Sequence, residues 1–163
     1  MLELIYETHS TTLDNEAGIA TGWLPGELSE TGREQALELG ARRHDVDAVF
    51  SSDLGRALET VAIAFFDSEV PIFHDWRLRE CDYGALNGAP RAELELEKHV
   101  EMPFPGGESY ADVLARIESF VDDVRRSWDG KRVLVVSHAA PLWALRQLLD
   151  GQQLEERGWT FTL

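Results

Sequence analysis

Short apolar runs alternate along the chain with longer stretches of helical periodicity. The runs are rich in Leu, Val and Ile, which is typical of strands buried on both faces of a sheet. The longer stretches repeat apolar side chains at three- and four-residue steps, which predicts amphipathic helices. The predicted strands are 2–7, 46–52, 70–76 and 132–137, and the predicted helices are 29–43, 53–66, 108–128 and about 141–149.

Polar residues with helix-capping spacing occur at the start of three predicted helices. Ser109 and Asp112 form a capping-box pattern in helix 108–128, and Thr31 and Glu34 have the same spacing in helix 29–43. Asp53 follows strand 46–52 and is a good N-cap residue for the helix after it. The apolar face predicted for helix 29–43 consists of Ala36, Leu37 and Gly40.

This alternation of strands and helices predicts one α/β domain over residues 1–163, a three-layer α/β/α sandwich around a mostly parallel sheet. The tail 158–163 alternates large apolar with smaller residues and predicts a short edge strand. In such sheets, ligands bind beyond the carboxyl ends of the strands. Strand 2–7 runs into His9, strand 46–52 ends at Ser51 and Ser52, and strand 132–137 runs into His138. We therefore expect three distant segments to bring polar groups to one edge.

Composition narrows the function without naming it. The net charge of −15 disfavours nucleic acid and anionic lipid as partners. No apolar run approaches the roughly 20 residues of a membrane helix, and the first residues lack the pattern of a secretory signal. The single cysteine cannot form an intramolecular disulfide. We expect a cytoplasmic protein with no membrane or nucleic-acid partner, whose oligomeric state stays open.

The candidate chemistry is anion binding. Arg56 lies three residues after the predicted N-cap, where free backbone N–H groups and the helix dipole already favour a phosphate. His9 and His138 are expected at the same edge of the sheet. In a chain of this charge, a few placed arginines must attract an anionic substrate, because the overall field repels it.

Six motifs in order resemble the histidine phosphatase superfamily, and especially its phosphoglycerate mutase-like branch. Each motif is weak alone, but together they cover nearly the whole chain with family-like spacing. The resemblance implies a phosphoglycerate mutase-like fold. The motifs are HSTT…N (9–15), TGW…LSETG (21–32), SSDLGRALETV (51–61), LRECDYGALNG (78–88), PGGES (105–109) and VLVVSHAAPL (133–142).

The resemblance also implies catalytic roles. His9 matches the nucleophile that becomes a phosphohistidine, and His138 and Arg56 match groups that bind the equatorial phosphoryl oxygens. Asn15 matches a phosphate-contacting asparagine. Glu80 matches a carboxyl that protonates the leaving oxygen and then activates water. These residue types suit phosphoryl transfer, which depends mostly on positioning and charge stabilisation.

The activity implied is hydrolysis of a small phosphorylated metabolite, with no metal and no organic cofactor. Thr21 and Tyr83 are candidates for substrate binding, and Ser10 for phosphate binding. A mutase-type phosphotransferase is a weaker alternative, because the chain is short and has no evident basic lid. A binding or regulatory protein that keeps the fold without turnover is the main rival.

The chain departs from the family at its defining triplet. Thr8-His9-Ser10 stands where the family has Arg-His-Gly. Loss of one preorganised charged group commonly costs about 10²- to 10³-fold in rate, so reduced or altered activity is expected. Glu7 takes the place of an apolar residue and would oppose a phosphate further if it faced the site.

Three explanations of this departure stay open. Arg77 or Arg79 could fill the vacated space. Alternatively, Ser10, Thr11 and Thr12 could supply neutral donors to a different substrate. The third explanation is that the protein binds its ligand without catalysis.

Several candidates also have simpler interpretations. Glu80 could form a surface ion pair with Arg79, and Asn15 could be a turn residue. Glu7, His9 and His138 could form a two-histidine, one-carboxylate site for iron or zinc. That metal site would ignore Arg56, whose charge is unfavourable beside a dication.

Overall fold

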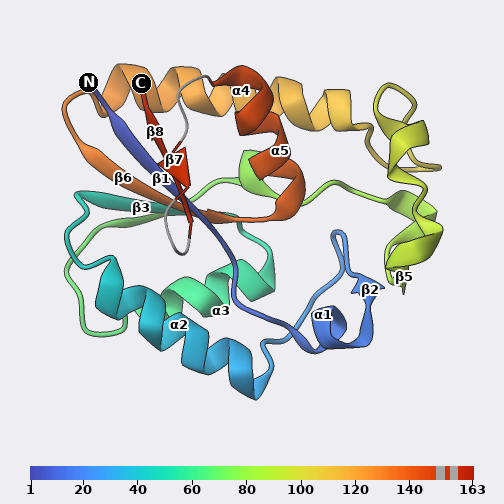
Figure 1. The fold of residues 1–163 in the computed structure, drawn as a ribbon, viewed down its shortest axis with the longest axis horizontal. Coiled ribbons are helices and arrows are strands. Elements are labelled where there is room, and N and C mark those ends of the chain that lie inside the picture. Colours follow the sequence, from blue (N-terminus) through green and yellow to red (C-terminus); the bar gives the residue numbers. More distant parts are fainter. Residues whose placement is uncertain (150–152, 155–157) are drawn as a thin grey trace.

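A six-stranded sheet organises the molecule (Figure 1). The structure, a computed structural model, describes residues 1–149, 153–154 and 158–163. The strand order is β4-β3-β6-β1-β8-β7, in which the first four strands are parallel and the last two pair antiparallel. The strands are β1 (Glu3–Thr8), β3 (Ala48–Ser51), β4 (Ile72–His74), β6 (Arg132–Ser137), β7 (Gln153–Leu154) and β8 (Trp159–Thr162). The mostly parallel sheet and the four predicted strands are confirmed, with β4 at one edge of the sheet.

Helices cover both faces of the sheet, as predicted. In Figure 1, α4 (Tyr110–Ser127) and α5 (Ala139–Leu148) lie above the sheet, and α2 (Glu30–Arg42) and α3 (Gly55–Ala64) lie below it. Successive β1 side chains alternate between the two layers. Leu4 and Tyr6 pack with α4 and α5, whereas Ile5 packs with α2 and α3. The central strands are therefore apolar throughout because both of their faces are buried.

The C-terminal strand was predicted at the edge of the sheet, and this placement is wrong. Strand β8 pairs antiparallel with β1, from Glu3 opposite Thr162 to Tyr6 opposite Trp159. Its other side pairs with β7, so β8 is an inner strand. Its alternating pattern shows only that one face is buried, as for Phe161, and does not reveal how many neighbours a strand has.

Helix α2 begins before the predicted capping box. Ser29 is the N-cap residue, and its side chain accepts a hydrogen bond from the Gly32 N–H, so Thr31 lies inside the helix. The predicted apolar face is also partly wrong, because Leu37 is exposed and Leu39 is buried. Ser29, two residues before Thr31, takes the N-cap position instead. Packing against the core, and not local spacing, decides which face of α2 is buried.

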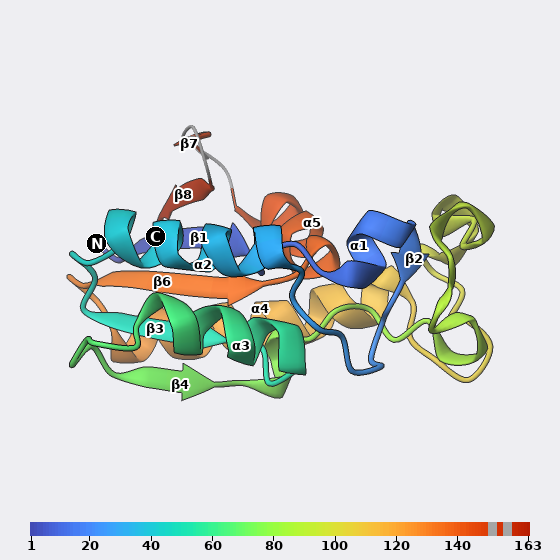
Figure 2. The ribbon, with the colours of Figure 1, turned by 90° about the horizontal axis from the view of Figure 1, so that it is seen from below.

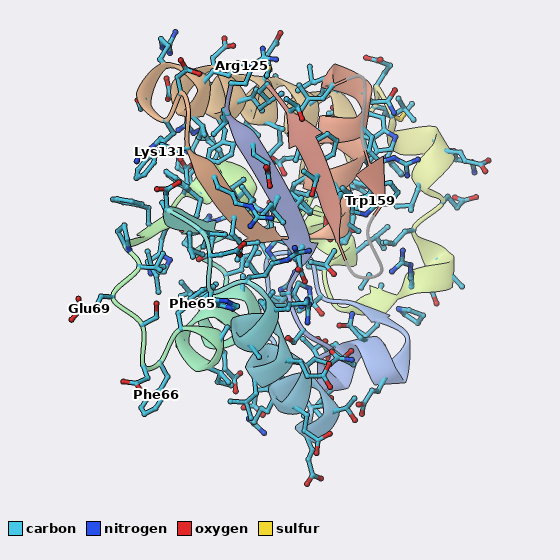
Figure 3. The ribbon with its side chains drawn as sticks, turned by 60° about the vertical axis from the view of Figure 1, so that its left-hand side comes forward. Phe65, Phe66, Glu69, Arg125, Lys131 and Trp159 are labelled. Carbon is cyan, nitrogen blue, oxygen red and sulfur yellow. The ribbon has the colours of Figure 1, made fainter. Side chains whose placement is uncertain are left out.

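Helix α3 begins after Leu54, not after Asp53. The Asp53 carboxylate is instead paired with the Arg79 guanidinium at 2.6 Å. At the other end, Phe65 turns into the core while Phe66 is 86% exposed, and Figure 3 shows Phe66 at the outer margin of the molecule. The helix is shorter than the predicted 53–66 at both ends.

The two helices of the other layer follow the prediction more closely. In α4, Ser109 and Asp112 form the expected capping box. Helix α5 starts two residues earlier than expected, with His138 itself as the N-cap residue and Pro141 in the first turn. The start of α5 is thus joined directly to the end of β6.

Every helix in the described part of the chain is too short or too polar to span a membrane.

A smaller extension lies beyond the carboxyl ends of the parallel strands, as Figure 2 shows from below. The extension contains α1 (Leu13–Ala17), the two-stranded pair β2 (Ile19–Ala20) and β5 (Ala89–Pro90), and 3₁₀ turns at Gly84–Leu86, Arg91–Glu93 and Leu96–His99, while a further 3₁₀ turn, Trp76–Leu78, packs against α4.

Candidate active site

The two strand-end histidines meet at the carboxyl edge of the sheet. Strands β1 and β6 are parallel neighbours with Thr8 opposite Ser137, so the next residues of each strand emerge together. The His9 N–H donates to the Ser137 carbonyl at 2.8 Å, and the rings of His9 and His138 are centred 5.0 Å apart. The predicted convergence of these two side chains is confirmed.

The His9 ring is oriented by its own loop. Its Nδ1 lies 2.7 Å from the Ser10 carbonyl oxygen, which can only accept, so Nδ1 carries the proton and Nε2 keeps a lone pair. Burial, and the Arg56 charge beside the ring, lower the pKa of His9 to about 4. The ring is therefore neutral at neutral pH, and its Nε2 is available as a nucleophile.

Arg56 places a buried guanidinium against this ring. It lies in the first turn of α3, where its Nε donates to His9 Nε2 at 3.3 Å. Its terminal nitrogens donate to the carbonyls of Gly22 at 2.8 Å and Leu24 at 3.3 Å. Gly22 has φ 56°, and a Cβ there would lie 1.8 Å from Asn87 Oδ1, so only glycine fits this turn. Loop 22–24 thus fixes the charge beside the nucleophile.

The Glu80 carboxylate sits at the N-terminus of α5. It accepts the N–H groups of Ala139 at 3.2 Å, Ala140 at 3.0 Å and Cys81 at 2.9 Å. An acceptor at this position is favoured by the free N–H groups and the dipole of the helix. The alternative pairing of Glu80 with Arg79 is wrong, because Arg79 is bound to Asp53.

The backbone of Glu80 is held as firmly as its side chain. Its carbonyl oxygen accepts from Trp23 Nε1 at 2.7 Å and from Arg116 Nη2 at 2.9 Å. Arg116 is itself buried and paired with Glu108 at 3.0 Å. The carboxylate therefore has a fixed position next to the two histidines.

A small cavity of about 40 Å³ opens in front of His9. Most of the predicted site residues line it, although His138 is fully buried behind His9. Ser10 lies outside this lining, and its N–H is bound to Thr60 Oγ1 at 3.1 Å. The lining consists of His9, Asn15, Ile19, Ala20, Thr21, Gly22, Arg56, Glu80, Tyr83, Arg91, Leu94 and Leu96.

Asn15 and Thr21 in this lining also make hydrogen bonds to neighbouring protein groups. Asn15 Oδ1 accepts from the Thr12 N–H, and Thr12 Oγ1 accepts from the Asn15 N–H, both at 3.0 Å, which closes a capping box on α1. Thr21 Oγ1 donates to Asp14 Oδ2 at 2.7 Å. Asn15 thus has a structural role, as a capping-box residue inside α1 and not as a turn residue, and its Nδ2 makes no hydrogen bond with the described residues.

Neither arginine expected to replace the missing one reaches the cavity. Arg77 is paired with Asp75 and Asp123, both at 2.7 Å, and Arg79 stacks on Trp23 while paired with a carboxylate. That explanation of the departure is wrong. Arg91 lines the cavity instead, and it makes no side-chain hydrogen bond or ion pair with the residues the structure describes. It is the only basic residue between Arg79 and Lys98, which is the one signal that could have identified it.

The substituted position, Thr8, is exposed and does not line this small cavity, but it lines a larger cavity of about 470 Å³ together with His9 and Ser10. Its neighbour Glu7 is buried, and its carboxylate is paired with Arg42 and, at 2.6 Å, with Arg43. Its charge is thus neutralised away from the small cavity. These pairs also engage the carboxylate that the alternative iron or zinc site requires. Across residues 1–149, 153–154 and 158–163, no three His, Cys, Asp or Glu side chains are grouped to hold a metal.

Known proteins resemble this chain over nearly its whole length. A model of the histidine phosphatase superfamily (branch 1) matches residues 8–162. "Phosphoserine phosphatase 1" of Hydrogenobacter thermophilus is 31% identical and aligns with 99% of this chain and 82% of its own length. A 2,3-bisphosphoglycerate-dependent phosphoglycerate mutase of a Methylobacterium species is also 31% identical, over 93% of this chain and 82% of its own. The structure of Bacillus stearothermophilus YhfR superposes with a TM-score of 0.82 at 25% identity, covering 100% of this chain and 96% of that one.

Proposed function

Because the chain belongs to the histidine phosphatase superfamily, we propose that it hydrolyses a phosphomonoester of a small metabolite through phosphorylated His9. The phosphatase and mutase relatives place phosphoryl transfer within the family. The observation that carries the proposal is the neutral His9 ring, with Nδ1–H held by a carbonyl and Nε2 facing the Arg56 guanidinium. This pair presents a lone pair and a positive charge to the same phosphoryl group.

In the first step, His9 Nε2 attacks phosphorus, and the bond from phosphorus to the alcohol oxygen breaks. Arg56 exchanges its bond to His9 for bonds to the phosphoryl oxygens, where negative charge is concentrated. Glu80 has to carry a proton when the substrate is bound, and it gives this proton to the departing alcohol oxygen; Oε2, which accepts one N–H, has room for the proton, whereas Oε1 accepts two. The products are phosphohistidine, the free alcohol and the Glu80 carboxylate.

In the second step, Glu80 removes a proton from water as the water oxygen attacks phosphorus. The bond from phosphorus to Nε2 breaks, which returns the neutral imidazole and releases inorganic phosphate. Glu80 ends with the proton it began with. Its three N–H partners keep the carboxylate in place through both steps, so the same oxygens act as acid and then as base.

A second positive charge is needed because Thr8 replaces the family arginine. We assign it to Arg91, which lines the cavity and whose side chain has no hydrogen bond or ion pair with the described residues. Arg56 comes from helix α3, and Arg91 from the 3₁₀ turn Arg91–Glu93. Asn15 Nδ2 and Thr21 complete the polar lining. Tyr83, which is buried and packs edge-on against Phe104, adds an aromatic ring to the lining.

The test is phosphate release from a panel of phosphomonoesters, including phosphoserine, 3-phosphoglycerate and p-nitrophenyl phosphate. His9→Ala should abolish phosphate release. The native protein should form an acid-labile phosphohistidine and no acid-stable label, and His9→Ala should form neither. His74→Ala is the matched control, since His74 also ends a strand but lies outside the cavity.

Release that persists in His9→Ala would refute the nucleophile. No release and no phosphohistidine from any compound would indicate a binding protein. Transfer of the phosphoryl group to phosphoglycerate in preference to water would indicate a mutase.

A further inference from the structure

A buried serine connects the two halves of the catalytic centre. Ser52 follows β3, is fully buried, and its N–H donates to the Val136 carbonyl at 3.1 Å. Its Oγ accepts the Leu54 N–H at 3.2 Å and lies 2.8 Å from His138 Nε2. One hydroxyl therefore joins the start of α3, which carries Arg56, to the second histidine.

Counting hydrogens decides which way the second bond runs. The Ser52 hydroxyl has one hydrogen, and the Leu54 N–H can only donate to it. If His138 Nε2 is unprotonated, the hydroxyl hydrogen is bound to it, and the remaining ring N–H is at Nδ1. If Nε2 is protonated, the hydroxyl hydrogen and the Nδ1 lone pair both lack a partner among the described residues.

The first arrangement is favoured because it leaves one buried polar group unpaired where the second leaves two. The ring is neutral in either case, since burial, with His9 and Arg56 nearby, lowers the pKa of His138 well below its ordinary value. The neutral ring carries one proton, and the serine determines which nitrogen holds it.

His138 Nδ1 is the one buried side-chain polar atom without a partner in the part of the chain that the structure describes. A buried donor without an acceptor, in a ring centred 5.0 Å from that of His9, indicates a ligand that brings its own acceptor. A phosphoryl oxygen on its way to His9 is such an acceptor.

We propose that Ser52 is a positioning residue that holds His138 in the Nδ1–H tautomer, so that this N–H is ready to donate to a phosphoryl oxygen. The inference rests on the proposed function for the identity of the acceptor. The tautomer itself is a property of the free protein.

The experiment is a two-bond ¹H–¹⁵N spectrum of the uniformly ¹⁵N-labelled, ligand-free protein at neutral pH, with the His138 signals assigned by their loss in His138→Gln. The native protein should show a proton on Nδ1. Ser52→Ala should shift the ring toward the Nε2–H form and lower kcat by at least about tenfold, as expected for a wrong histidine tautomer. Ser52→Thr, which keeps the hydroxyl, should retain the native signals.

Ser51→Ala is the matched control. Ser51 is equally buried, but its hydroxyl lies 2.8 Å from Nδ1 of His74, so the His138 signals should not change. A native Nε2–H tautomer overturns the proposal, and so does a Ser52→Ala protein with unchanged Nδ1–H. The native spectrum decides even if Ser52→Ala fails to fold. The expected spectra without any phosphate release would refute the proposed function and leave the tautomer assignment standing.

Discussion

The cavity has two unlike sides. One, the strand side, is built from residues that directly follow strands of the parallel sheet or begin the next helix. The other, the loop side, is built from the extension beyond the sheet. The strand side consists of His9 and Arg56, with His138 buried against His9 outside the lining, and the loop side consists of Asn15, Thr21, Tyr83 and Arg91.

The difference lies in what fixes each side. Register between parallel strands fixes the strand side, as in the bond from the His9 N–H to the Ser137 carbonyl. Local caps and turns fix the loop side, such as the Asn15–Thr12 capping box. The strand side thus has one geometry for any substrate, while the loop side can change with its local sequence. We infer that the strand side carries the phosphoryl chemistry and the loop side discriminates among leaving groups.

The largest expected effect is on the strand side. Arg56→Ala should lower kcat by at least about a hundredfold, because it removes a preorganised positive charge from the phosphoryl group. Measurement of kcat and KM on the best substrate of the panel checks this. Arg79→Ala, which removes an arginine paired with Asp53 outside the cavity, is the control. A loss below threefold in Arg56→Ala would remove it from the phosphoryl site.

The strand side should also make stability depend on pH. The pKa of His9 is about 4 in the folded protein and near 6.5 unfolded. Between these values the unfolded chain binds more protons, so the contribution of His9 to stability is complete above about pH 6.5 and is lost as pH falls toward 4. The slope is about 1.4 kcal/mol per pH unit for one histidine, or about 3 kcal/mol over the window.

Chemical denaturation of the native protein and of His9→Asn, from pH 8 to pH 4, isolates this contribution. With the difference at pH 8 as reference, the native protein should lose stability relative to the variant from about pH 6.5 downward. Parallel curves would show that His9 is not held neutral by the fold.

On the loop side the expected effect is smaller. Arg91→Ala should weaken activity by about tenfold, because an exposed guanidinium is partly screened by solvent. It should act more on KM than on kcat if Arg91 holds the substrate before the reaction. Arg91→Lys should recover part of the loss. If KM and kcat of Arg91→Ala equal those of the native protein, Arg91 does not replace the family arginine that is absent at Thr8.

The strand side could be predicted from sequence, and the loop side only in part. Apolar runs ending in His9 and His138 place both side chains at one edge, because parallel strands share their carboxyl ends. Arg91 lies in a 3₁₀ turn with no periodicity, so nothing in the local pattern directs it into a cavity. Arg77 and Arg79 are close to Glu80 in sequence, yet carboxylates far along the chain, Asp123 and Asp53, draw them away.

The smallest expected effect concerns Asn15. It lies on the loop side, yet the family resemblance predicts that it contacts the phosphate, as the strand-side residues do. Its Oδ1 caps α1 and its Nδ2 is the candidate phosphate donor. Asn15→Asp keeps an acceptor for the Thr12 N–H, and a carboxylate in the first turn of a helix is favourable. It removes the Nδ2 donor and adds a negative charge to the cavity. Stability should therefore stay within about 0.5 kcal/mol of native, while activity falls.

Asn15→Ala separates the two roles further. It also removes the bond from the Thr12 N–H to Oδ1, while Thr12 remains the N-cap residue, so the free energy of unfolding should fall by about 1 kcal/mol. Activity should fall less than in Asn15→Asp because no charge is introduced. Thermal denaturation and steady-state kinetics on the three proteins provide both readouts. If Asn15→Asp keeps full activity, the role of Asn15 is limited to the capping box of α1. On the loop side, Arg91 would then be the residue proposed to contact the phosphoryl group, and the Asn15 amide would not contact it.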